Sequence, residues 1–187
     1  IGSDLPDFDR LCVASWSALG HEAVVYAYEE VSNLPPGAKL RDAETILPRR
    51  VLFDEAPGLR PALRADVFRM AMVAAGAGMW MDTDVLLLRP APEPDDILIA
   101  RERGGRLCNA VFWASPEFEM MEAVIAAFRT RATPPWSRGK LRWRRLRNRL
   151  SGRADSLSDY PLHQWGRHAL EHFARKHRLA DRALPVE

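Results

Sequence analysis

The sequence predicts an α/β domain with a largely parallel sheet, and two observations lead to this expectation. Apolar runs typical of strands alternate with segments of helical periodicity. The chain has 187 residues, 47% of them hydrophobic, which is enough for one sizeable core but not for two ordinary domains. We therefore expect a single domain over residues 1–187, with a basic excursion at 137–153 and with ligands bound beyond the carboxyl ends of strands.

The first half of the chain alternates helices and strands around a loop-rich stretch. A helix is predicted over residues 7–19, with Asp7 as its N-cap and Gly20 as its stop. A strand at 23–28 follows, and then a proline- and glycine-rich stretch with a short helix near 43–47. An apolar helix at 61–75 ends at a glycine-containing turn and leads into a short strand at 79–81.

The second half continues the same alternation. Strands are predicted at 97–100 and 107–114, the latter interrupted by Asn109 within an otherwise apolar run. Pro116 suits the start of a helix that reaches residue 128. Prolines 134 and 135 separate this helix from the basic segment, and a final helix covers the region from Trp165 to His177.

Two aspartates follow the buried strand at 79–81, separated by one residue. Desolvating the ionised carboxylates of Asp82 and Asp84 is costly unless a cation or hydrogen-bond donors compensate. Mg²⁺ or Mn²⁺ suits such hard oxygen ligands, and the phosphates of a substrate can complete its coordination shell. The alternative is a turn in which the two aspartates accept hydrogen bonds from backbone donors.

A polar pair interrupts the apolar helix at 61–75. Asp66 and Arg69 are three residues apart and therefore share a face of this helix, which is apolar nearly all round. Such a helix is buried, so the pair either forms a private ion pair or faces a polar ligand in a cleft. Asn109 also lies in an apolar segment, and one interpretation is a core amide that hydrogen-bonds only to backbone.

Together these residues resemble a known enzyme signature. Residues 65–70 (ADVFRM) and 78–85 (GMWMDTDV), continuing to Arg89 and Pro90, resemble the motif of DXD-type, sugar-nucleotide-dependent glycosyltransferases. The branch is the sugar-binding-region family with the initiating mannosyltransferases of yeast, bacterial capsular polysaccharide transferases and, more distantly, the glucosylating clostridial toxins. Weaker matches extend over nearly the whole chain. The resemblance implies a GT-A-like, Rossmann-type domain with a mostly parallel central sheet flanked by helices.

The resemblance also implies an activity and a role for each residue. The expected reaction moves a hexose from UDP- or GDP-hexose to a hydroxyl of a glycan or lipid-linked acceptor, with a metal ion and with retention of configuration. Asp66 and Arg69 would bind hydroxyls of the transferred sugar, and Asn109 would lie near that sugar. Asp82 would contact the ribose and the metal, and Asp84 would bind Mn²⁺ or Mg²⁺ directly.

A third metal ligand is expected near the C-terminus. Residues 165–170 resemble the Gly-Pro segment of the family, with Arg167 in place of the proline. His168 is the candidate ligand and His163 a second one. The alternative for both is a surface histidine on an amphipathic helix.

The positive charge of the chain is concentrated in one segment. Residues 138–153 contain eight Lys or Arg and no acid, and the remainder has 19 basic against 25 acidic residues. Trp143, Leu146 and Leu150 share one helical side of this segment, which could lie on an anionic membrane that carries lipid-linked acceptors. The alternative is a solvated excursion whose apolar residues dock on the core. We expect no nucleic-acid binding, because no recognition motif accompanies the charge.

The two cysteines bear on the cellular compartment, and two alternative functions are also compatible with the sequence. Cys12 and Cys108 lack the spacing of a zinc site or a disulfide framework, which favours buried thiols and a cytoplasmic setting. With the basic segment at 138–153, we expect a position peripheral to the inner membrane face. An Asp-nucleophile phosphatase would instead use Asp82, although Asp95 and Asp96 follow too closely to serve as its acidic pair. The other alternative to an active glycosyltransferase is an inactive transferase-like module that binds a membrane or a partner through residues 138–153.

Overall fold

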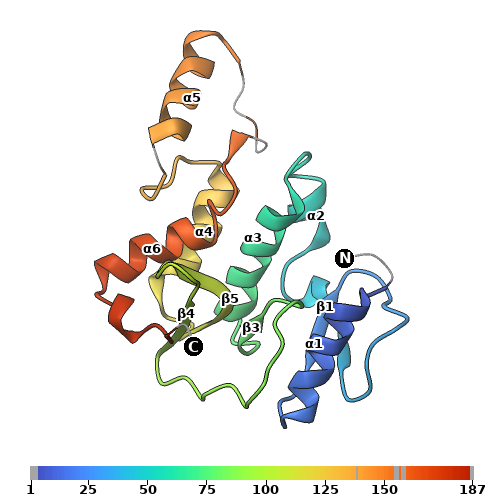
Figure 1. Cartoon of the computed structure of the whole chain (residues 1–187). Helices are drawn as coiled ribbons and strands as arrows, with labels where there is room; N and C mark the ends of the chain where they lie inside the picture. Colours follow the sequence, from blue (N-terminus) through green and yellow to red (C-terminus); the bar gives the residue numbers. More distant parts are fainter. Residues whose placement is uncertain (1–3, 138, 154–155, 157–158, 186–187) are drawn as a thin grey trace.

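The computed structural model describes residues 4–137, 139–153, 156 and 159–185 (Figure 1). The described helices and strands come in runs and do not alternate regularly as the sequence predicts: a pair of strands and a group of three strands are each followed by consecutive helical segments. Two of the short elements, η1 and η3, are single 3₁₀ turns. In chain order the elements are α1 (Asp7–Ala18), β1 (Val24–Ala27), β2 (Lys39–Asp42), η1 (Ala43–Thr45), α2 (Arg49–Phe53), α3 (Pro61–Ala74), β3 (Trp80–Met81), β4 (Ile97–Arg101), β5 (Leu107–Ala114), α4 (Glu119–Thr130), α5 (Gly139–Leu150), α6 (Arg167–Lys176) and η3 (Ala180–Arg182).

The expectation of a mostly parallel, Rossmann-type central sheet is wrong. The described strands form two small sheets: a parallel pair of β1 and β2, and a three-stranded sheet in the order β3-β5-β4. In the larger sheet β5 runs antiparallel to both of its neighbours. The fold is α/β in composition, but it is not the GT-A-like arrangement that the resemblance implies.

The length of one connection explains why β5 runs antiparallel to β4. Only residues 102–106 separate β4 from β5, and so short a connection permits a hairpin, whereas a parallel pair needs a crossover of a dozen or more residues. Residues 82–96, between β3 and β4, include Pro90, Pro92 and Pro94. Prolines lack the N–H that a helix interior requires, and no helix forms in this connection between β3 and β4, which both run antiparallel to β5.

The predicted helices are present with shifted ends. In α1 the N-cap is Pro6, and Asp7 is the first helical residue instead of the cap. α4 begins at Glu119 instead of Pro116, because the Phe118 N–H donates to the Ser115 carbonyl in a turn that precedes the helix. The sequence reading missed β2 and α2. All four residues of β2 are exposed, so no apolar pattern marks this strand.

The larger of two hydrophobic clusters surrounds α3 and involves α4, α6, β4 and β5. Its most deeply buried side chains include Leu63, Met70, Phe112, Met120 and Trp165. The smaller cluster joins α1 to β1 through Val13, Trp16, Ala23 and Val25. Figure 1 shows α3 between these two regions, with α5 projecting from one end of the molecule. In the part of the chain that the structure describes, no helix is both long and apolar enough to cross a lipid bilayer.

Candidate functional site

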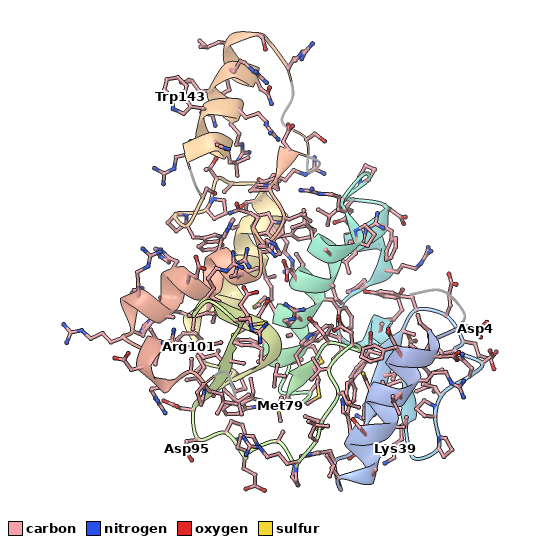
Figure 2. All side chains as sticks on the ribbon, in the orientation of Figure 1. Asp4, Lys39, Met79, Asp95, Arg101 and Trp143 are labelled. Carbon is pink, nitrogen blue, oxygen red and sulfur yellow. The ribbon has the colours of Figure 1, made fainter. Side chains whose placement is uncertain are left out.

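Of the two alternatives for Asp66 and Arg69 on α3, the ion pair is present. The Arg69 Nη1 donates to the Asp66 Oδ1 at 3.0 Å, and only 4% and 8% of these two residues are exposed. The pair is buried because the helix is surrounded by the core: every residue from 66 to 73 is buried. Figure 2 shows side chains packed on several sides of α3. Two charges thus lie where water cannot solvate them well, and each needs a local partner.

Asp82 joins this pair from the end of β3. The Arg69 Nη2 donates to the Asp82 Oδ1 at 2.5 Å, and the Trp80 Nε1 donates to the same oxygen at 2.6 Å. The Arg69 guanidinium also lies over the Trp80 ring, 4.9 Å from its centroid. Arg69 therefore bridges two carboxylates from separate elements, and Trp80 contacts both charges.

Asp66, Arg69, Trp80 and Asp82 form one contact network, called the cluster below. Asn109 belongs to this cluster because β5 runs antiparallel to β3. The register pairs Met81 with Val111, and the Asp82 N–H donates to the Ala110 carbonyl at 2.7 Å. Asn109 therefore lies beside the turn that follows β3, where its Nδ2 donates to the Asp66 Oδ1 at 3.3 Å. The amide is thus satisfied by a carboxylate, a partner that the core-amide interpretation did not include.

Gly166, at the start of α6, packs directly against Asp66 and Asn109. A Cβ at position 166 would lie 2.6 Å from the Asp66 Cγ, and closer still to the Asp66 Oδ1 and the Asn109 Nδ2. Real Cβ atoms do not approach other atoms within 3.0 Å, so no other residue fits here without movement. The next residue, Arg167, donates to the Glu102 Oε1 at 2.9 Å and ties α6 to the β4–β5 hairpin.

The two aspartates that follow β3 lie in a turn. The Val85 N–H donates to the Asp82 carbonyl at 3.0 Å, and the Thr83 Oγ1 donates to the Asp9 Oδ2 of α1 at 2.6 Å. Asp84, at the tip, is exposed, and no described residue forms a hydrogen bond or an ion pair with its side chain. The turn therefore presents one carboxylate inward, at Asp82, and one outward, at Asp84.

The electrostatics of the cluster favour a further positive charge. Asp66 and Asp82 bring two carboxylates to the single guanidinium of Arg69, which bridges them. Burial raises the pKa of Asp66, although Arg69 and the Asn109 amide oppose this shift by stabilising the ionised form. Burial, and then the charge of Arg167, lowers the pKa of the nearby His163, which is therefore neutral at pH 7.

The carboxylates fit a divalent cation only if a ligand supplies further oxygens. Among residues 4–137, 139–153, 156 and 159–185, no group of three or more His, Cys, Asp or Glu side chains is arranged to hold a metal ion. Mg²⁺ and Mn²⁺ bind one or two carboxylates together with substrate phosphates, and Asp82 and Asp84 meet that smaller requirement. His168 lines a pocket with Trp136 and His172, and its role as a metal ligand stays a prediction.

Three contributors to the site were not identified as such from the sequence. Trp80 precedes Asp82 by two residues, so the alternation of side chains along a strand would have placed both on one face. The tight packing of Gly166 depends on how α6 docks, and a lone glycine gives no signal of that. Asp9 belongs to a distant helix, and nothing in its own neighbourhood points to Thr83.

Comparisons with known proteins do not assign the chain to a family. No protein-family model, no curated protein and no solved structure matches it significantly.

Proposed function

We propose that this protein is a metal-dependent hexosyltransferase that uses a nucleotide diphosphate sugar, either a UDP- or a GDP-hexose, as its donor. The proposal rests chiefly on one observation: Arg69 bridges Asp66 and Asp82 within a buried cluster, and the exposed Asp84 follows Asp82 by two residues in the same turn. It also draws on the resemblance of residues 65–70 and 78–85 to the DXD-type transferase signature. The small antiparallel sheet lends the proposal no support.

The cluster has the chemistry that a sugar requires. Carboxylates accept hydrogen bonds from hydroxyl groups, while guanidinium and amide N–H groups donate to hydroxyl oxygens. Asp66, Arg69 and Asn109 provide both kinds of group within one contact network. The side chain of Asp82 is 32% exposed, against 11% for Asp66, so a ligand reaches the cluster from the side of the Asp82 turn. The sugar would bind nearest α3, and the nucleotide nearest the turn.

Asp82 and Asp84 would hold the divalent ion together with the donor diphosphate. When bound, such an ion neutralises the negative charge that develops on a departing phosphate. In the proposed reaction, an acceptor hydroxyl oxygen bonds to the anomeric carbon as the bond from that carbon to the diphosphate oxygen breaks. The hydroxyl proton passes to the departing phosphate oxygen, which is close by when attack occurs on the same face. Retention of configuration follows from this geometry.

We place this activity in the cytoplasm, with a glycan or lipid-linked acceptor. Cys12 and Cys108 are both free thiols. Secreted and periplasmic proteins tend to form disulfides, so unpaired cysteines are in keeping with a reducing compartment. Which hexose and which acceptor are used depends on loops around the cluster, such as residues 101–106.

Calorimetric titration of the full chain with a panel of UDP- and GDP-hexoses, with and without Mn²⁺, tests the proposal. We expect at least one donor to bind in a Mn²⁺-dependent manner. Asp84→Ala should weaken that binding at least tenfold, because it removes the exposed carboxylate. Asp95→Ala is the matched control, since Asp95 is an exposed aspartate in the connection between β3 and β4, remote from the turn (Figure 2).

Two results would contradict the proposal. One is the absence of binding for every donor in the panel, and the other is equal binding by the unmodified chain and by Asp84→Ala. Release of inorganic phosphate from a generic phosphomonoester, lost in Asp82→Asn, would instead favour the Asp-nucleophile phosphatase, which forms an aspartyl-phosphate at that residue.

A further inference from the structure

The outward face of α5 is both apolar and cationic. Trp143 is 73% exposed, Leu150 is 82% exposed and Leu146 is 46% exposed. At 3.6 residues per turn, these three positions lie on one side of the helix. Figure 2 shows Trp143 on the part of α5 that projects from the body of the molecule. Large apolar side chains at such exposure, gathered on one helix face, mark a surface that contacts something other than water.

Cations border this apolar stripe on both sides. Helical geometry places Lys140 and Arg147 along one border and Arg142 and Arg149 along the other. All four are exposed, and none of them forms an ion pair with a carboxylate of the described residues. The charges of this face therefore remain available to an external anion, while the apolar stripe remains available to an apolar phase.

The opposite face of α5 is docked on the protein, so the helix is already formed and oriented. Leu141, Arg145 and Asn148 are its buried residues. The Arg145 Nη1 donates to the Thr133 Oγ1 at 2.6 Å, and the Asn148 Nδ2 donates to the Asp159 Oδ2 at 3.3 Å. The stripe and its cationic borders face outward, and binding would not have to fold the helix first.

We propose that the outward face of α5 binds the surface of an anionic lipid bilayer. Tryptophan prefers the headgroup level, leucine side chains enter the acyl boundary, and basic residues beside them attract anionic headgroups. A nucleic acid would use the cations but not an exposed Trp and two Leu in one stripe, and the rest of the chain has six more acidic than basic residues. The inference does not depend on the proposed sugar transfer.

Co-sedimentation of the full chain with vesicles tests this inference, using phosphatidylcholine alone and an equimolar mixture with phosphatidylglycerol. We expect binding to the anionic vesicles only, and a fall of at least tenfold when salt rises from 0.1 M to 0.5 M. Trp143→Ser with Leu150→Ser should reduce binding at least tenfold. Leu88→Ser is the matched control, because Leu88 is 87% exposed outside α5.

Substitutions of arginines test the contribution of the cationic borders to vesicle binding separately from that of the apolar stripe. Arg147→Gln with Arg149→Gln should weaken vesicle binding at least tenfold, whereas Arg103→Gln with Arg129→Gln, which neutralises exposed arginines elsewhere, should change it less than threefold. Failure of the unmodified chain to bind anionic vesicles at 0.1 M salt would overturn the inference. So would equal loss in both arginine pairs, or tighter binding to a DNA duplex than to the vesicles.

Discussion

Replacement of Gly166 by alanine tests how tightly α6 closes the cluster. The constraint that this substitution tests is the space around Gly166, whose backbone angle φ is −99°, outside the left-handed region. An added Cβ would lie 2.6 Å from the Asp66 Cγ. Ordinary contact between carbon atoms begins near ~3.5 Å, so α6 or the Asp66 side chain must move by about 1 Å.

That displacement has a predictable energetic effect. Overpacking a well-packed site costs ~1–3 kcal/mol, and Asp66 has little freedom because Arg69 and Asn109 both hold it. We expect Gly166→Ala to lower the free energy of unfolding by about 2 kcal/mol. For a chain of this length that corresponds to a fall in Tm of about 4–8 °C. Urea denaturation followed by circular dichroism measures the first quantity, and calorimetry the second.

Two comparisons make the result interpretable. Gly139→Ala is the matched control, because no atom lies within 4 Å of a Cβ added there, and this variant should be neutral or slightly stabilised. In a double-mutant cycle, Asp66→Ala should relieve the part of the clash that involves Asp66, while the contact with the Asn109 Nδ2 remains. Gly166→Ala should then cost at least 1 kcal/mol less in that background, roughly the coupling of residues in contact. Strict additivity, or a single variant within about 0.5 kcal/mol of the unmodified chain, would refute the packing argument.

Two further predictions concern the carboxylates. Burial raises the pKa of Asp66 above its unfolded value of 3.8, so the folded state keeps this proton to higher pH. The chain should therefore lose stability relative to Asp66→Asn as the pH rises from 3.8 through the raised pKa of the folded state. Urea denaturation between pH 4 and 7 checks this sign, and a constant difference would contradict it. Asp82→Asn should cost ~1–3 kcal/mol by weakening two charge-assisted hydrogen bonds, whereas an equal loss in the exposed control Asp84→Asn would rule out that cause.

Local patterns predicted much of the helical structure, but they carried no information on strand direction. The apolar helix that became α3 and the strand that became β3 were placed within a residue of their observed ends. The antiparallel pairing of β5 with β4 follows from the five-residue connection between them. Hydrophobic periodicity is the same in both directions, so a sheet predicted from periodicity alone had the wrong topology.

In the candidate site, too, local contacts could be predicted from the sequence and tertiary contacts could not. Asp66 and Arg69 could be paired from the sequence because three residues of helix bring them onto one face, and the ion pair confirms it. Asp82 and Asn109 were singled out as polar residues beside or within apolar strands, but their contacts with Arg69 and Asp66 depend on sheet register. The proximity of Gly166 depends on how a distant helix docks, which no short segment encodes.

The late position of Gly166 has a consequence for how the cluster is assembled on the ribosome. Asp66, Arg69, Asp82 and Asn109 all precede residue 115, so α3, β3 and β5 can meet while the rest of the chain is still being made. Until α6 emerges and docks, water can still reach the Asp66 carboxylate and solvate its charge. We therefore expect dehydration of the charged pair to wait for α6, and a chain stalled before residue 166 to keep that pair in contact with solvent.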